Sequence, residues 1–172
     1  MEKTFIYMKK NLLLLFIAVC GFMAFQSCSD DDDNDLGQVS EEFVNALKNK
    51  FPDATGVKWE QKSTYRVAEF KKNMTDIDVW FNPKAEWVMT NTDYGKDLFM
   101  IPSEIGKAFA DSQFADWTID DIDLYERPDK SFYVFEVEKK GMRDMELYFN
   151  TDGSMIKAIE DADMDILPTT PV

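Results

Sequence analysis

The chain contains no histidine and only two cysteines among its 172 residues. Histidine is the commonest general base and the commonest ligand of transition metals, so its absence removes both uses. Nucleophilic pairs of the Ser–His and Cys–His types are excluded for the same reason. Ser–Lys chemistry would need a buried lysine, whereas Lys62 with Ser63 and Lys130 with Ser131 lie in segments that we expect to be turns. The sequence therefore predicts a protein that is not an enzyme and that needs no cofactor.

Basic residues are also scarce. The chain has 19 lysines and arginines against 33 aspartates and glutamates, which gives a net charge of −14 at pH 7. A chain of this charge repels nucleic acid and anionic membrane surfaces. We therefore expect a protein or peptide partner that is neutral or basic, and no nucleic acid.

Long hydrophobic runs are limited to one segment near the N-terminus. Residues 12–25 are nearly all apolar and follow a short basic stretch. Such a run is too short to span a bilayer and is typical of the central part of a signal peptide, although a buried helix is an alternative. We predict residues 1–27 as a lipoprotein signal peptide. Cys20 falls inside it, so the mature chain would have neither a disulfide nor a free thiol.

Cys28 directly follows this segment, at the place of the cysteine that carries lipid in bacterial lipoproteins. Ser27 fits the small residue expected before that cysteine, whereas Phe25 replaces the usual Leu or Val. Residues 29–35, mostly aspartate, resemble the acidic segment of surface-exported lipoproteins of the Bacteroidetes. We predict an acidic linker over 28–38 and membrane attachment only through lipid on Cys28. The expected location is the cell envelope, as an outer-membrane lipoprotein that is either surface-exposed or periplasmic.

One sequence pattern occurs twice, in residues 77–87 and 145–155. Both copies read apolar, acidic, apolar and aromatic, followed by Phe-Asn, turn residues and a new apolar start. The Phe-Asn pair is Phe81-Asn82 in the first copy and Phe149-Asn150 in the second. The two copies predict a duplicated β-hairpin.

Two helices are predicted at matching places before these hairpins. The first begins at Ser40 and is stopped by Pro52, and the second begins at Pro102. Their apolar residues follow helical spacing, at Phe43, Val44, Leu47 and Phe51 in the first helix and at Ile105, Ala108 and Phe109 in the second.

Each predicted helix is followed by four strand-like runs, at 57–60, 65–70, 77–81 and 87–89 and again at 119–125, 132–137, 145–149 and 155–159. Short turns join the runs, so consecutive strands must be antiparallel. The sequence predicts an α+β fold of two tandem helix-plus-four-strand repeats, 39–98 and 99–162, with antiparallel sheets and the helices packed on one face. One repeat alone is marginal in size, so we expect the two to share a sheet edge or to pack helix against helix. Residues 163–172 are predicted to be a flexible tail.

These residues also resemble a known family. Phe51-Pro52-Asp53-Ala54, followed by Val57-Lys58-Trp59-Glu60 and the Phe-Asn hairpin, resemble the PepSY-like, β-lactamase-inhibitor-like lipoprotein family of the Bacteroidetes over residues 39–160. The first hairpin departs from the pattern, with Pro83-Lys84-Ala85 where the second has Thr151-Asp152-Gly153, so a looser first turn is expected. The resemblance implies a tandem helix-on-sheet protein exported from the cytoplasm. The family's name describes shape and does not define a biochemical role.

The alternation within the two hairpins predicts a binding surface. If Ile77, Val79 and Phe81 face the helix, an acid and an aromatic residue face the other way in each copy. The predicted partner-binding residues are Asp78, Trp80, Glu146 and Tyr148, joined by Trp59. The alternative is that the rings only complete cross-strand packing and that Trp59 belongs to the core.

The sequence thus predicts a non-catalytic, lipid-anchored binding module of the cell envelope, with inhibition of a protein or peptide partner as one form of its action. A carboxylate-based hydrolase and a small-ligand or cation sensor are the alternatives. The acid pairs that a hydrolase would use are Asp76/Asp78, Asp144/Glu146 and Asp120/Asp121/Asp123. Asp161, Asp163 and Asp165 have the spacing that begins a calcium loop, but Ile166 replaces its glycine, so no metal site is predicted.

Overall fold

The computed structural model describes residues 39–162 and 164–172. The predicted signal peptide, the lipidation site at Cys28 and the acidic linker lie outside the described residues, and so does Asp163. Within the described part, no helix is long and apolar enough to cross a membrane.

The helices and strands follow the predicted order. The first repeat contains α2 (Glu41–Lys50), β1 (Lys58–Lys62), β2 (Tyr65–Lys72), β3 (Thr75–Phe81) and β4 (Trp87–Asp93). A short 3-10 helix, η1 (Leu98–Met100), leads into the second repeat. That repeat contains α3 (Ser103–Ala110), β5 (Thr118–Glu126), β6 (Ser131–Glu138), β7 (Met145–Asn150) and β8 (Met155–Glu160). The predicted tandem arrangement is confirmed.

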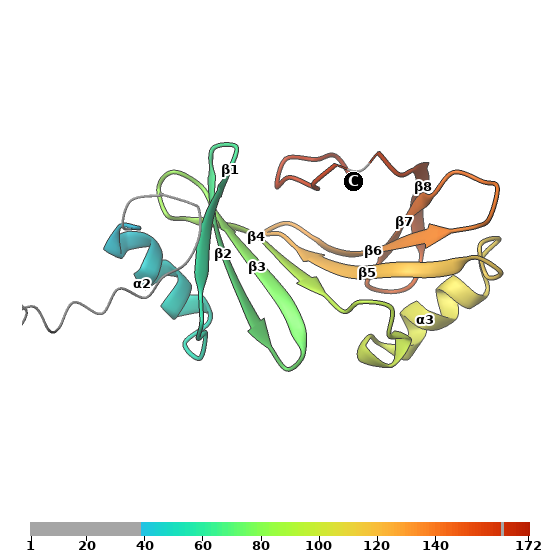
Figure 1. Cartoon of the computed structure of the whole chain (residues 1–172), viewed down its shortest axis with the longest axis horizontal. Helices are drawn as coiled ribbons and strands as arrows, with labels where there is room; N and C mark the ends of the chain where they lie inside the picture. The colour runs from blue at the N-terminus through green and yellow to red at the C-terminus, as the bar shows by residue number, and fades with distance from the viewer. Residues whose placement is uncertain (1–38, 163) are drawn as a thin grey trace, which may run out of the picture. The chain divides into compact units, whose positions relative to one another are not determined.

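The eight strands form one antiparallel sheet in chain order, β1 to β8. The two repeats meet where Thr90–Asp93 of β4 pair with Asp123–Glu126 of β5. Of the two expected ways of joining the repeats, the structure therefore uses the shared sheet edge. Figure 1 shows β4 and β5 side by side at the centre of the sheet.

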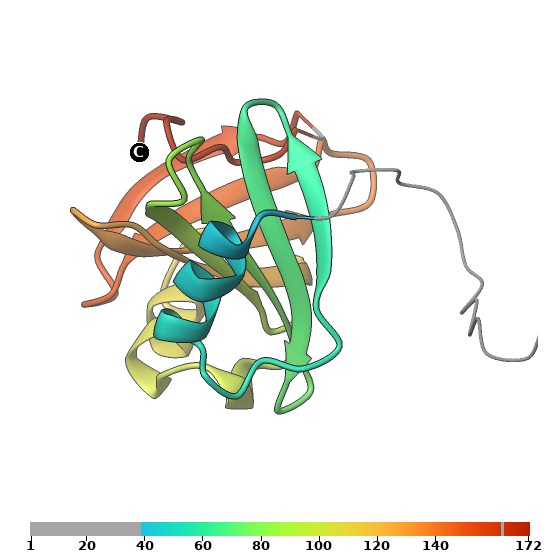
Figure 2. The ribbon, with the colours of Figure 1, turned by 90° about the vertical axis from the view of Figure 1, so that its left-hand side faces the viewer.

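Both helices cover the same face of the sheet. Leu47 of α2 is buried in a cluster with Val79 and Phe81 of β3, and Phe43 packs against that cluster. Ile105 and Phe109 of α3 are buried in a second cluster with β5, β6 and β7. Figure 2 shows α2 in front of the strands of the first repeat. The predicted helical faces and the inward direction of alternate strand residues are thus confirmed.

The duplicated hairpins close in the same way. In the first, Asn82 N donates to Glu86 O at 3.0 Å and Ala85 N donates to Asn82 O at 2.9 Å. In the second, Asn150 N donates to Ser154 O at 2.8 Å and Gly153 N donates to Asn150 O at 2.9 Å. Ala85 adopts φ 57° where Gly153 adopts φ 85°, so the first turn keeps a left-handed residue without glycine. The expectation of a looser first turn is wrong, because the same hydrogen bonds close both turns.

A third apolar cluster lies on the other face of the sheet and joins the two repeats. We call it the central cluster. Its buried members come from β2 to β7 and from the C-terminal segment, and are Val67, Trp80, Met89, Tyr125, Phe132, Val134, Tyr148 and Ile166.

Residues 164–172 cover this cluster, whereas the sequence predicts a flexible tail from residue 163. Ile166 is 7% exposed within the central cluster, and Leu167 and Val172 pack against it. In Figure 1 this segment lies on the opposite side of β5 and β6 from α3. The apolar residues at 166, 167 and 172 explain the difference, since they extend the buried surface of the sheet.

Candidate functional site

A row of carboxylates crosses the sheet on the face that the helices leave uncovered. Each acid lies an even number of positions from a member of the central cluster on the same strand, so both point to the same face. The row extends from β2 to β7 and combines residues of both repeats. We call it the acidic strip; its members are Glu69, Asp78, Asp93, Asp121, Asp123, Glu136 and Glu146.

The strand register places like charges directly opposite each other in this strip. The opposed pairs are Glu69 with Asp78, Asp93 with Asp123, Asp121 with Glu136, and Glu136 with Glu146. Like charges directly opposite each other destabilise a sheet. Wherever both acids of a pair are ionised, the folded protein therefore carries an electrostatic cost on this face, which a bound cationic group would lower.

Lys62 neutralises the end of the strip at β2 and β3. Its Nζ lies 3.5 Å from Glu69 Oε1 and 3.4 Å from Asp78 Oδ2. Burial lowers the pKa of Lys62, but the charges of Asp78 and Glu69 outweigh burial and raise it above the usual value. Burial raises the pKa of Asp78 by more than Lys62 lowers it. A depression of about 660 Å³ opens beside this end, lined in part by Gly56 and Lys58.

The centre of the strip is a triad of acids from both repeats. Asp93, Asp121 and Asp123 each offer a carboxylate oxygen, and these oxygens lie within 4.8 Å of one another. Burial and then the charge of Asp121 raise the pKa of Asp123 to about 8, against a hydrogen bond from Asn91 that lowers it. Burial and the charge of Asp93 raise the pKa of Asp121 to about 6. Asp121 and Asp123 can therefore hold a proton near neutral pH, and the carboxylate oxygens of the triad are also the ligands that Ca²⁺ prefers.

The end of the strip at β6 and β7 lies beneath the C-terminal segment. Burial and the charge of Asp161 raise the pKa of Glu136 to about 7. The hydroxyl of Tyr148 donates a hydrogen bond of 2.5 Å to Glu146 Oε2. Within the part of the chain that the structure describes, no ion pair reaches Glu136 or Glu146. A cavity of about 210 Å³ lies here, lined by Tyr125, Glu136, Glu146, Asp161, Met164, Asp165 and Ile166.

The predicted site residues lie in three different surroundings. Trp80 and Tyr148 are 3% and 1% exposed in the central cluster, and Glu146 is buried beside Tyr148. These side chains do lie on the face away from the helices, but they are buried there among neighbouring strands, in the cluster to which Ile166 of the C-terminal segment belongs. The alternative that the rings complete cross-strand packing therefore describes Trp80 and Tyr148. Asp78 is half-buried in the strip, whereas Trp59 packs in the cluster beneath α2, on the opposite face. A role of these residues in partner binding stays a prediction.

Three members of the strip, Glu69, Asp93 and Glu136, were not singled out from the sequence. Glu69 and Glu136 lie in predicted strands, each two positions from an apolar residue of the central cluster. The alternation of side chains along a strand therefore places both on the sheet face away from the helices. Asp93 follows the end of the predicted strand at 87–89, and its neighbours Asp121 and Asp123 come from the other repeat. That proximity depends on β4 pairing with β5, which no local pattern encodes.

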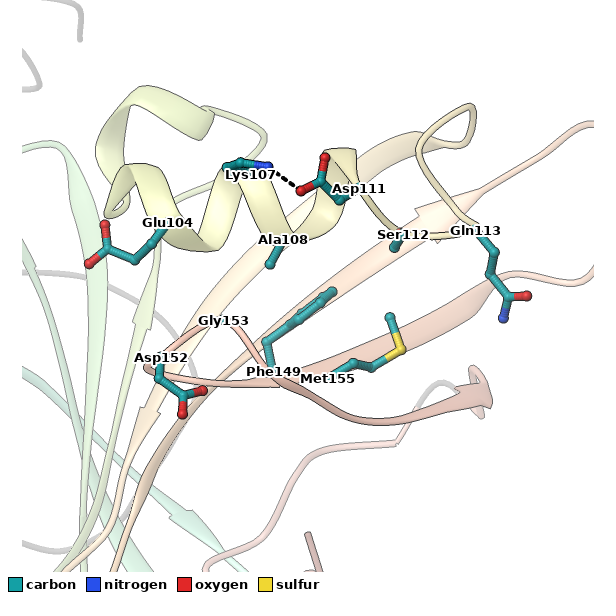
Figure 3. Close-up of a pocket in the computed structure, with 10 residues that line it drawn as sticks. All are labelled: Glu104, Lys107, Ala108, Asp111, Ser112, Gln113, Phe149, Asp152, Gly153 and Met155. Carbon is teal, nitrogen blue, oxygen red and sulfur yellow. Dashed lines mark hydrogen bonds and ion pairs between the residues drawn. The ribbon is translucent and has the colours of Figure 1, made fainter.

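Figure 3 shows a third pocket, of about 600 Å³, between α3 and the β7–β8 turn. Lys107 and Asp111 form an ion pair on its rim, and Phe149 forms part of its floor. A Cβ added at Gly153 would lie 3.2 Å from Glu104 O and 3.3 Å from the Cβ of Ala108. The pocket therefore lies along the line where the β7–β8 hairpin packs against α3.

Comparisons with known proteins agree with the fold. Residues 63–157, more than half of the chain, match the model of the family described as "Putative beta-lactamase-inhibitor-like, PepSY-like". No curated protein matches the chain. Two solved structures are similar at 31% and 32% identity. The first, a BLIP-like protein from Bacteroides fragilis, has a TM-score of 0.70 over 80% of this chain and 99% of its own. The second, a "putative periplasmic" protein from Bacteroides eggerthii, has a TM-score of 0.65 over 72% and 90%.

A DUF2874 family protein from Bacteroides ovatus is also similar, with 28% identity and a TM-score of 0.67 over 77% of this chain and 92% of its own. The family match runs from the β1–β2 turn into β8, so it includes parts of both repeats and the β4–β5 junction at which the triad forms. Together with the eight-stranded sheet and its paired helices, these matches show that the chain belongs to the PepSY-like, β-lactamase-inhibitor-like family.

Proposed function

We propose that this protein is a non-catalytic, lipid-anchored module of the cell envelope that binds a protein or peptide partner through the acidic strip. The strip supports the proposal because it concentrates seven acidic side chains on one sheet face. Among the described residues, Lys62 is the cation that forms ion pairs with them. A basic side chain of a partner would lower the repulsion between opposed acids and the desolvation cost of the strip. The partner is therefore expected to present lysine or arginine to this face.

The family description and the BLIP-like relative favour inhibition as the consequence of binding. A β-lactamase is accordingly the first partner to test, by following hydrolysis of a chromogenic β-lactam with and without the protein. The periplasmic description of one relative supports a place in the envelope. Attachment through Cys28 would be tested by mass spectrometry of the N-terminal peptide, and Cys28→Ser should release the protein from the membrane fraction.

The strip itself is tested with two variants of equal charge. The first is Glu69→Gln, Asp78→Asn and Glu136→Gln, which neutralises three acids of the strip. The control is Glu42→Gln, Asp53→Asn and Glu104→Gln, which removes three exposed acids from elsewhere.

Capture of envelope proteins by the unmodified protein is compared with capture by both variants, at low and at high salt. We expect the same captured protein with the control variant and at least about tenfold less with the strip variant, because rim charges act through complementarity that salt screens. Equal capture by both variants would refute the proposal.

A cation site is the second candidate, because the oxygens of Asp93, Asp121 and Asp123 lie within 4.8 Å of one another. Calorimetric titration with Ca²⁺ tests it, with Asp121→Asn as the variant that should lose the heat. No heat with the unmodified protein would remove this candidate.

The carboxylate-based hydrolase alternative finds the raised pKa that it needs in Glu136. However, the cavity at this residue, about 210 Å³, is below the range of about 300–1,000 Å³ typical of small-molecule sites. At Glu136 the binding function therefore fits better, whereas Asp78, whose pKa is also raised, lines the larger depression of about 660 Å³.

A further inference from the structure

Cationic side chains hold the C-terminal segment, residues 164–172, against the sheet. Their hydrogen bonds measure 2.8–2.9 Å; three end on peptide carbonyl oxygens of the segment, and one ends on the O atom of its last residue, Val172. The bonds are Arg127 Nη1 to Thr170, Arg127 Nη2 to Leu167, Lys130 Nζ to Val172 and Lys157 Nζ to Pro171. Carbonyl oxygens are present in any polypeptide, so these bonds recognise an extended chain rather than a particular sequence.

The segment adds an apolar anchor to these bonds. Ile166 is buried in the central cluster, and Leu167 packs beside it. Residues 164–172 contain no strand and do not pair with β8. Among the described residues, their backbone forms a single turn, in which Thr170 N donates to Leu167 O at 2.8 Å. The segment is thus bound as a peptide would be, through one buried aliphatic side chain and its main chain.

The covered surface retains hydrogen-bonding capacity that the segment does not use. Arg127 Nε, on the guanidinium that holds the segment, is a buried donor without an acceptor among the described residues. An unpaired buried donor costs about 1–3 kcal/mol. An occupant whose carbonyl oxygens were placed differently would recover this free energy, so the segment is not the best ligand for the surface.

The charges around the segment also favour a different occupant. Asp165 of the segment lines the cavity that Glu136 and Glu146 also line. Its charge acts favourably on Lys62, but it adds one more acid beside the strip. A lysine or arginine at the position of Asp165 would place a positive charge among these carboxylates instead.

We propose that residues 164–172 occupy, within the same chain, the site of an extended partner segment, and must leave before that segment binds. This inference rests on the proposed function and adds the chemistry of the partner. The partner segment has an aliphatic residue in the place of Ile166, a basic residue one position before it, and main-chain carbonyls that accept from Arg127, Lys130 and Lys157.

The test uses a synthetic peptide of residues 164–172 as the probe, together with a second peptide that carries D165K. Binding of both is measured to the full-length protein and to its Ile166→Ser/Leu167→Ser variant, whose segment is released. Thr169→Ser, at an exposed position of the same segment, is the control variant.

We expect the released variant to bind the probe at least about tenfold more tightly than the unmodified and control proteins, because the resident segment no longer competes. The D165K peptide should bind more tightly than the native one, and added salt should reduce that difference. Equal affinity of all three proteins, or a folded released variant that does not bind the probe, would overturn the inference.

A second measurement on the unmodified protein does not require the variant to fold. Amide hydrogen exchange should be faster at Leu167 and Thr170 than in β6, since the segment opens without unfolding the sheet. Exchange at these amides only through global unfolding would overturn the inference.

The two proposals can fail separately. If the strip variant loses the captured partner but the released variant captures it no better than the unmodified protein, the strip binds a partner without displacing the segment. If the released variant binds the peptide while the strip variant still captures the partner, the proposed function fails and the peptide site remains.

Discussion

Asp123 makes the protein's stability depend on pH in a way that one substitution should reveal. This carboxyl is 6% exposed at the centre of the triad, and its pKa is raised from 3.8 to about 8 by burial and by Asp121. Between these two values the folded state keeps a proton that the unfolded state has lost. The free energy of unfolding therefore contains this contribution in full below about pH 4 and loses it as pH rises toward 8.

The magnitude follows from the linkage. Each unit of pKa difference corresponds to 1.36 kcal/mol, so a carboxyl protonated only in the folded state would cost up to about 4 kcal/mol at pH 7. The raised pKa of the neighbouring Asp121 reduces that figure, because its charge is one of the causes of the shift in Asp123. Asp123→Asn keeps the shape and cannot ionise, and its amide can donate to the two remaining acids. We expect the variant to unfold like the unmodified protein near pH 4 and to be more stable by about 2–4 kcal/mol near pH 8.

The assay is urea denaturation followed by tryptophan fluorescence at about pH 4, 6 and 8, with Asp53→Asn as a control at an exposed turn residue. The quantity of interest is the difference in free energy of unfolding between variant and unmodified protein at each pH. A difference that does not grow with pH would show that Asp123 is ionised in the folded state, and the account of the triad would be wrong.

Three further substitutions test the packing. Trp80→Ala should cost about 3–5 kcal/mol, because the ring is buried in the central cluster, whereas Trp80→Phe should cost much less; equal small losses on thermal denaturation would mean that the ring is free. Gly153→Ala should destabilise the protein more than Gly141→Ala, since both glycines have φ near 85° but only a Cβ at 153 would meet α3. The melting temperatures of the two variants should differ by several degrees, and equal melting temperatures would contradict close packing of the β7–β8 turn against α3. Tyr148→Phe should cost about 1–3 kcal/mol in urea denaturation by removing the hydrogen bond to buried Glu146, and no loss would argue against that bond.

Local patterns were sufficient to predict the elements and their duplication. Both helices and all eight strands are present, because helical spacing and strict alternation each leave a periodic trace that a single segment carries. The Phe-Asn turns could be matched at Asn82 and Asn150 for the same reason. The face that each residue takes was also readable within a strand, so Val79 and Trp80 were correctly placed on opposite faces.

What could not be predicted depends on contacts between distant segments. The apolar residues at 166, 167 and 172 are few and lie among acids and prolines, so a disordered tail was the reasonable interpretation. They become core residues only because they pack against the aromatic side chains of the central cluster, on the sheet face away from the helices. Trp80 is buried in the same cluster, and its ring packs edge-on against that of Tyr65, another contact between separate strands. The triad likewise requires β4 to pair with β5, and the sequence left that pairing open against contact between the helices.

The β4–β5 junction has a consequence for how such a surface can originate. Asp93 belongs to the first repeat and Asp121 and Asp123 belong to the second, so neither repeat alone could assemble the triad. A repeat on its own would leave β4 as an unpaired edge strand, open to pairing with another chain. Joining the two repeats closes that edge and, in the same step, places acids of different repeats opposite each other. The centre of the acidic surface therefore exists only where both repeats are present in one sheet.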